Sequence, residues 1–123
     1  MARTHKKVRY LQKSKAREYT PVTAARDVEQ AFKVLEGRWK LLILFHLFGG
    51  QVRRFSELER ALDGISQKML AQQLRSLEAE GIVVRTVYNE VPPKVEYRLT
   101  AWGQSLCPAL DALLEWDERR GRP

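Results

Sequence analysis

Three polar side chains between residues 67 and 72 have the types and spacing that contact with nucleic acid bases requires. Gln67, Lys68 and Gln72 lie on the side of a predicted helix that its leucines leave open. A glutamine amide can form two hydrogen bonds with adenine, and lysine can bind guanine or a phosphate. The pattern favours a surface that contacts bases over the alternative, a solvated helix face.

Other side chains could bind the sugar–phosphate backbone and so position this surface on the nucleic acid. Arg53 and Arg54 precede a predicted helix, and Lys94 ends a predicted loop between two strands. Arg75 has two interpretations, because it could bind a phosphate or form an ion pair with Glu78, three residues further along the helix. The candidate contacts with nucleic acid are therefore Arg53, Arg54, Ser66, Gln67, Lys68, Gln72, Arg75 and Lys94.

Catalytic and metal chemistry has little support in the sequence. His5, His46 and Cys107 are far apart, and no CxxC pair accompanies them, so they do not predict a metal site. No phosphate-binding loop or convincing nucleophile–base pair is present. We expect no enzyme, no metal and no cofactor. Cys107 is the only cysteine, and we expect an inert thiol because no cation or helix N-terminus is predicted beside it.

The net charge of +7 is concentrated at one end of the chain. Residues 1–18 hold seven basic residues and one acidic residue, which leaves 15 basic and 14 acidic residues elsewhere. We expect residues 1–20 to form a flexible basic arm and residues 21–123 to form one folded domain. The arm is suited to contact with phosphates, while a solvated tail or a mitochondrial presequence is the alternative.

Hydrophobic periodicity predicts four helices before residue 82. The first begins near Thr23 as its N-cap, and a central buried helix covers residues 39–48. A short third helix begins at a capping box formed by Ser56 and Glu59 and ends near Leu62. The fourth covers residues 67–80, with Ser66 as its N-cap. The apolar run at 41–48 is too short to cross a bilayer, so we expect a cytoplasmic protein without membrane contact.

After Gly81 the pattern changes to the two-residue period of strands. Strands are predicted at 83–88 and 95–100, joined by the loop 89–94, and a last helix at 100–119. Two short helices joined by a tight turn and followed by a hairpin are typical of a winged helix-turn-helix. The expected fold class is mainly α with a small β-hairpin (α+β), with additional N- and C-terminal helices for dimerisation.

A series of short motifs resembles one family of proteins. The chain carries, in order, Gly37-Arg38-Trp39, Arg54-Phe55-Ser56-Glu57-Leu58, Gly64-Ile65-Ser66-Gln67-Lys68-Met69-Leu70, Leu74-Arg75-Ser76-Leu77-Glu78, Gly81-Ile82-Val83, Pro92-Pro93-Lys94-Val95-Glu96-Tyr97, Leu99-Thr100, Gly103 and Trp116. Together they resemble the HxlR-type transcription regulators over residues 24–117. The resemblance implies a dimeric winged helix-turn-helix with the helix after Ser66 in the major groove of double-stranded DNA. By analogy it implies a repressor that binds a pseudo-palindromic operator.

One position departs from the redox-sensing members of that family. Those members carry a reactive cysteine at the start of the first helix, and the matching position here is at or near Arg26. No cysteine lies near it, so the resemblance does not extend to thiol sensing by that route. An RNA-associated basic protein is the rival function, but the near-neutral body and the lack of an RNP-type aromatic motif disfavour it.

The last predicted helix carries an apolar stripe at the spacing of packed helices. Such a stripe favours a homodimer, to which the first helix adds its own apolar side chains. Trp39, Trp102 and Trp116 could instead line a pocket for a small-molecule effector, although packing is the favoured interpretation. The candidate dimer residues are Ala24, Val28, Phe32, Trp102, Leu106, Ala109, Leu113 and Trp116.

Overall fold

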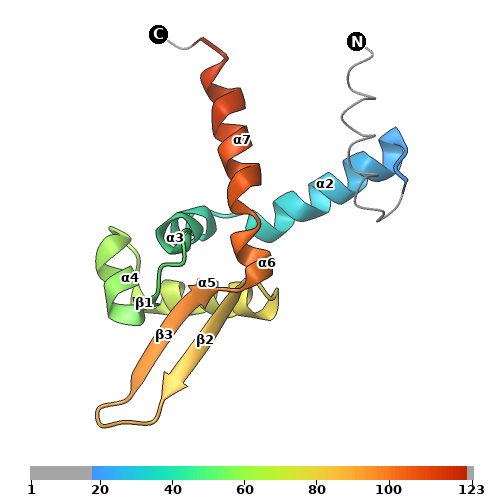
Figure 1. Ribbon diagram of the computed structural model, residues 1–123. Helices are drawn as coiled ribbons and strands as arrows, with labels where there is room; N and C mark the ends of the chain where they lie inside the picture. Colours follow the sequence, from blue (N-terminus) through green and yellow to red (C-terminus); the bar gives the residue numbers. More distant parts are fainter. Residues whose placement is uncertain (1–17, 122–123) are drawn as a thin grey trace. The chain divides into compact units, whose positions relative to one another are not determined.

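The computed structural model describes residues 18–121 (Figure 1). Two compact units divide the chain, the first ending at Glu36 and the second beginning at Gly37. Helix α2 lies in the first unit and all other described elements lie in the second. In chain order the elements are α2 (Pro21–Leu35), α3 (Lys40–Leu47), β1 (Arg53–Arg54), α4 (Phe55–Ala61), α5 (Gln67–Ala79), β2 (Val83–Tyr88), β3 (Lys94–Leu99), α6 (Ala101–Gln104) and α7 (Cys107–Glu118).

Helix α2 begins earlier than the sequence predicts. Its N-cap is Thr20, whose hydroxyl accepts a hydrogen bond from the backbone N–H of Thr23 at 3.1 Å. The hydroxyl of Thr23 accepts one in return from the N–H of Thr20 at 3.0 Å. The prediction of Thr23 as N-cap was wrong because Pro21, whose φ is fixed near the helical value, already begins the helix. None of the residues of α2 is buried.

The hydrophobic core of the second unit is built around α3. Ile43, Leu44 and Leu47 of this helix are fully buried, whereas Leu41, Leu42 and Phe45 are exposed, so the predicted burial of the helix holds for one face only. Residues from α4, α5, β2, β3 and α7, and from the segments between α4, α5 and β2, complete the core. Its other buried members are Leu58, Leu62, Ile65, Leu70, Leu74, Leu77, Ile82, Val83, Tyr97 and Leu110.

The sheet has one strand more than the predicted hairpin. The strand order is β1-β3-β2, and both neighbouring pairs are antiparallel. Arg53 and Arg54 form β1, opposite Tyr97 and Glu96 of β3. Two arginines carry no alternating pattern, so nothing in the sequence marks them as a strand. Lys94 belongs to β3, opposite Tyr88, and not to the loop where the sequence analysis put it.

The cap of α4 also differs from the prediction. The helix begins at Phe55, and the carboxylate of Glu57 accepts a hydrogen bond from the N–H of Arg54 at 2.8 Å. The predicted capping box of Ser56 and Glu59 is therefore wrong, since both residues lie inside the helix. Pairing of Arg54 with β3 keeps that residue extended. The helix therefore begins two residues earlier in the sequence than predicted.

The last predicted helix, at residues 100–119, is interrupted. It forms as α6 and α7, with Ser105 and Leu106 between them. Pro108 has no N–H to donate to the carbonyl of Gln104, and its ring opposes a continuous helix at that point. The single long helix was therefore a wrong prediction, although Pro108 was visible in the sequence. Within residues 18–121, no helix is long and apolar enough to cross a membrane.

Gly103 brings α6 against the end of the sheet. A Cβ atom at this position would lie 2.3 Å from the carbonyl oxygen of Ile82, which is too close for any side chain. Thr100 fixes the same junction, because its hydroxyl donates to the carbonyl of Gly81 at 2.7 Å and accepts from the N–H of Gly103 at 3.0 Å. The direction in which the chain leaves β3 is thus set by close backbone packing.

Candidate nucleic-acid interface

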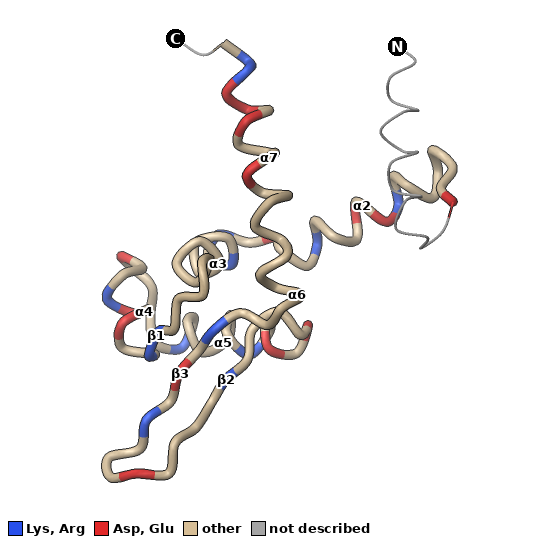
Figure 2. The backbone as a smooth tube through the Cα atoms, in the orientation of Figure 1, with Lys and Arg blue, Asp and Glu red and all other residues tan. Residues whose placement is uncertain are grey.

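Helix α5 has one apolar and one polar face, as predicted. Leu70, Leu74 and Leu77 are buried, while Gln67, Lys68, Gln72 and Arg75 are exposed. The core therefore holds the helix by its leucines and leaves the polar side chains outward. Figure 2 shows basic residues on α5 and on the sheet beside it.

The start of α5 is fixed as the sequence predicts. Ser66 is the N-cap, and its hydroxyl oxygen accepts a hydrogen bond from the N–H of Met69 at 3.0 Å. The hydroxyl proton can still be donated to another group. Before it, Gly64 has a φ of +88°, which favours glycine and forms the tight turn between α4 and α5. The two helices and this turn form the helix-turn-helix.

The candidate arginines before α4 have different surroundings. Arg53 is half-buried, and its Nε donates to the carbonyl of His46 at 3.4 Å. Arg54 is exposed at the N-cap position of α4. Of the two, Arg54 is therefore the exposed one, although both belong to the strand β1.

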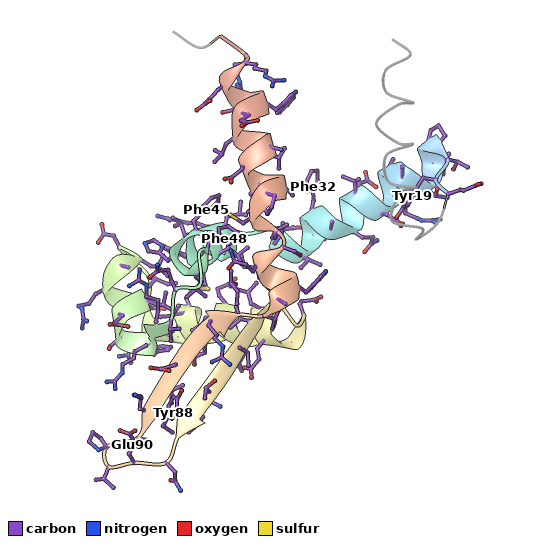
Figure 3. All side chains as sticks on the ribbon, viewed as in Figure 1. Tyr19, Phe32, Phe45, Phe48, Tyr88 and Glu90 are labelled. Carbon is purple, nitrogen blue, oxygen red and sulfur yellow. The ribbon has the colours of Figure 1, made fainter. Side chains whose placement is uncertain are left out.

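Lys94 is held within the hairpin formed by β2 and β3. Its Nζ lies 3.8 Å from a carboxylate oxygen of Glu96 and 4.7 Å from the ring centre of Tyr88. Figure 3 shows Tyr88 on the hairpin and Glu90 at its tip. A lysine with these neighbours has part of its charge already balanced by the hairpin itself.

Two arginines of the sheet were not among the candidates. Arg85 and Arg98 are both exposed. Arg98 donates from its guanidinium to the hydroxyl of Thr86 at 3.2 Å. In the sequence both residues appear only as polar positions within predicted strands, which does not distinguish a DNA contact from a solvated side chain.

This chain is similar to known proteins that regulate transcription. Residues 34–123 match the family model described as HxlR-like helix-turn-helix. The chain belongs to the HxlR-like helix-turn-helix family. The uncharacterized HTH-type transcriptional regulator YtcD of Bacillus subtilis (strain 168) is 54% identical over 90 residues, which cover 73% of this chain and 71% of that protein.

Solved structures agree with the HxlR-like assignment. A transcriptional regulator of the MarR family from Enterococcus faecalis V583 is similar, with a TM-score of 0.75 and 41% identity, over 85% of this chain and 91% of that chain. The redox regulator HypR in its reduced form is similar, with a TM-score of 0.70 and 46% identity, over 76% and 91%. The resemblance seen in the sequence is confirmed, as are the winged fold and transcription regulation through DNA binding.

The thiol of this HxlR-like protein has a different setting from the one the sequence predicts. Because the last helix is interrupted, Cys107 is the first residue of α7, so the expectation that no helix N-terminus lies beside it was wrong. Its Sγ lies 4.0 Å from a carboxylate oxygen of Asp111, and the thiol is half-buried. Arg26 lies in α2, where its Nε is 3.8 Å from a carboxylate oxygen of Asp27.

The carbonyl of His46 accepts a hydrogen bond from the DNA-binding candidate Arg53, while the imidazole ring has a partner in its own helix. Nδ1 of His46 is 2.8 Å from the carbonyl oxygen of Leu42, inside its own helix. Trp39 is half-buried under the guanidinium of Arg38, at 4.6 Å, whereas Trp102 and Trp116 are exposed. Among residues 18–121, no cluster of ligands that could hold a metal ion is found. The basic arm lies mostly outside the described residues, so its contact with phosphates stays a prediction.

Proposed function

We propose that this protein is a sequence-specific transcription repressor that binds duplex DNA as a homodimer and catalyses no reaction. The observation that carries the proposal is the outward polar face of α5, whose opposite face is fixed in the core. A helix of this kind fits the major groove, where each base pair presents a distinct pattern of donors and acceptors. We also propose that the protein acts in the cytoplasm of a bacterium or archaeon, where the chromosome lies.

Three side chains of α5 supply the base contacts in this proposal. Gln67, Lys68 and Gln72 are exposed on the first half of the helix, the part that enters the groove in helix-turn-helix proteins. The remaining candidates hold the backbone, with charge or with a hydroxyl that can donate to a phosphate. These backbone contacts are Arg53, Arg54, Ser66, Arg75 and Lys94.

The homodimer is supported by apolar side chains that one chain leaves exposed. On α2 these are Val28 and Phe32, with Ala24 half-buried. In the second unit Trp102, Leu113 and Trp116 are exposed, Ala109 lies beside them in the sequence of α7, and Leu106 is half-buried. Large apolar side chains gathered on terminal helices are typical of association surfaces. A two-fold dimer would present two α5 helices to a pseudo-palindromic operator.

Selection of bound duplexes from a random pool tests the proposal directly. The full chain should enrich an inverted repeat with half-sites about one or two helical turns apart. Enrichment of a single half-site would contradict the dimer but not the base contacts. Binding without any enrichment would contradict sequence-specific regulation itself. A small-molecule effector is outside this test, and its presence can be examined once the operator is known.

A further inference from the structure

Two arginines from different elements line one hollow between α5 and the sheet. The hollow has a volume of about 320 Å³ and is lined by Ala71, Leu74, Arg75, Glu78, Arg85 and Tyr97. Arg75 and Arg85 are exposed. Within residues 18–121, neither guanidinium takes part in an ion pair or a side-chain hydrogen bond, so the alternative of an Arg75–Glu78 ion pair is not realised. Both groups therefore have unused donors beside the same space.

The strand register explains why Arg85 reaches this hollow. Arg85 lies opposite Tyr97, and residues opposite each other in an antiparallel pair point to the same face of the sheet. Tyr97 is only 7% exposed and belongs to the face that packs on the core. Arg98, one position along β3, lies on the other face and is hydrogen-bonded to Thr86. The exposed arginines Arg85 and Arg98 of the hairpin thus point to opposite sides of the sheet.

The place of Arg75 on α5 relates the hollow to the proposed groove contact. Lys68, Gln72 and Arg75 follow the four-and-three spacing that keeps side chains on one stripe of a helix. At 1.5 Å per residue, Arg75 lies about 10 Å along the helix axis from Lys68. The major groove is roughly 12 Å wide. When Lys68 and Gln72 contact bases, Arg75 comes to the edge of the groove, where the phosphates lie.

We propose that the hollow binds one phosphate of the DNA backbone, to which Arg75 and Arg85 both donate. A guanidinium presents its N–H groups as a planar fork that fits two phosphate oxygens. The carboxylate of Glu78, which also lines the hollow, opposes an anion there and weakens the site. Arg85 becomes a DNA contact outside the candidate set. This inference rests on the proposed function, because it takes its ligand from the duplex.

Single substitutions on the two faces of the sheet test the role of Arg85. Arg85→Ala should weaken binding of the full chain to operator and to random duplex alike, by about tenfold at low salt. It should also reduce the slope of log affinity against log salt by about 0.9 for each protomer on the duplex. Arg98→Ala is the matched control, since it removes the same charge from the other face and should change affinity less than twofold. Equal losses in the two variants would overturn the proposal.

A duplex with one neutral methylphosphonate linkage identifies the phosphate. At one linkage in each half-site the wild-type protein should lose about tenfold in affinity, and Arg85→Ala should lose clearly less there, because only Arg75 still donates to that phosphate. Additive losses at every linkage would overturn the shared contact. Titration with inorganic phosphate at constant ionic strength addresses the other source of the anion. Protection of both arginine Nε–H signals by phosphate, without coupling to any linkage, would assign the hollow to a free anion and overturn the DNA contact.

Removing the negative charge of Glu78 should change DNA affinity in the opposite direction to removing the charge of Arg85. Glu78→Gln should strengthen binding to any duplex by about two- to fivefold, because it removes a negative charge beside the phosphate. Glu80→Gln, a change of the same charge outside the hollow lining, should have a smaller effect. Thermal unfolding of each variant checks that its fold is intact. If the wild-type protein binds no duplex sequence selectively, the proposed function is contradicted. If Arg85→Ala and Glu78→Gln bind DNA as the wild-type protein does, only this inference is contradicted.

Discussion

Helices α5 and α7 both pack one face on the core, and they differ in what the other face carries. On α5, Gln67, Lys68 and Gln72 are exposed above leucines that are buried. On α7, Leu110 is 7% exposed, while Leu113 and Trp116 are 44% and 67% exposed. A polar outward face can exchange hydrogen bonds with bases, whereas an apolar one is stabilised only by another apolar surface. The comparison separates the proposed DNA contact from the proposed protein contact within one small unit.

The largest effect is expected on the apolar side of this comparison. Replacing Leu113 and Trp116 together with Asp should give a folded monomer and lower operator affinity by about 10²–10⁴-fold, because two half-sites are no longer bound together. Sedimentation and operator titration measure the two results. Leu110→Ala is the contrast, since it should cost about 2–5 kcal/mol of unfolding free energy. A wild-type monomer at micromolar concentration that binds its operator one-to-one would contradict the dimer.

The next effect is expected on the polar side. Gln67→Ala or Gln72→Ala should cost about 1–3 kcal/mol of binding free energy on the operator and little on random duplex, because a base contact is lost. Competition titrations with both kinds of DNA measure the difference. Gln73, which lies half-buried and donates to the sulfur of Met69, provides the control position. Equal losses of affinity on both duplexes would indicate that Gln67 and Gln72 contact the DNA backbone and not the bases.

A smaller effect is expected from Lys94, because its ammonium group already has partners within the hairpin. Lys94→Ala should weaken binding to any duplex by about two- to threefold, because Glu96 and Tyr88 partly occupy the ammonium group before DNA arrives. Glu96→Gln should have the opposite sign, since it releases Lys94 toward a phosphate. Fluorescence anisotropy with a random duplex resolves both changes. A tenfold loss in Lys94→Ala would make the hairpin a primary contact like α5.

No effect is expected from oxidants. Peroxide, diamide or quinone should leave operator affinity unchanged, because no cysteine lies at or near Arg26 and Cys107 has the carboxylate of Asp111 beside it. Mobility-shift titrations before and after treatment measure this, with Cys107→Ser as the control. A loss of binding that Cys107→Ser abolishes would show that this thiol senses oxidants in spite of its acidic neighbour.

Hydrophobic periodicity was sufficient to predict the elements that position α5. The leucines of α5 and the alternation in β3 are strong patterns, and Ser66 has a cap signal of its own. The pattern failed where tertiary pairing decides, as in β1, which is a strand only because Arg53 and Arg54 meet β3. It also failed at Pro108, where the three-to-four spacing of apolar residues continued through a break in the helix.

The candidate side chains could be named from the sequence, but their partners could not. The contact of Lys94 with Tyr88 depends on the cross-strand register, which a loop containing Pro92 and Pro93 does not determine. The same register directs Arg85 toward α5 and Arg98 away from it. Which arginine faces the hollow is therefore a property of the folded sheet and not of residue type.

The packing of Gly103 on Ile82 has a consequence for which DNA sites a dimer can occupy. In the proposed homodimer, the distance between the two α5 helices depends on the angle at which the C-terminal segment leaves the sheet. That angle is fixed where the Cα of Gly103 meets the carbonyl of Ile82, with no room for one methyl group. A substitution here would change the half-site spacing that fits the protein, from a position outside the proposed contacts with DNA and with the other subunit.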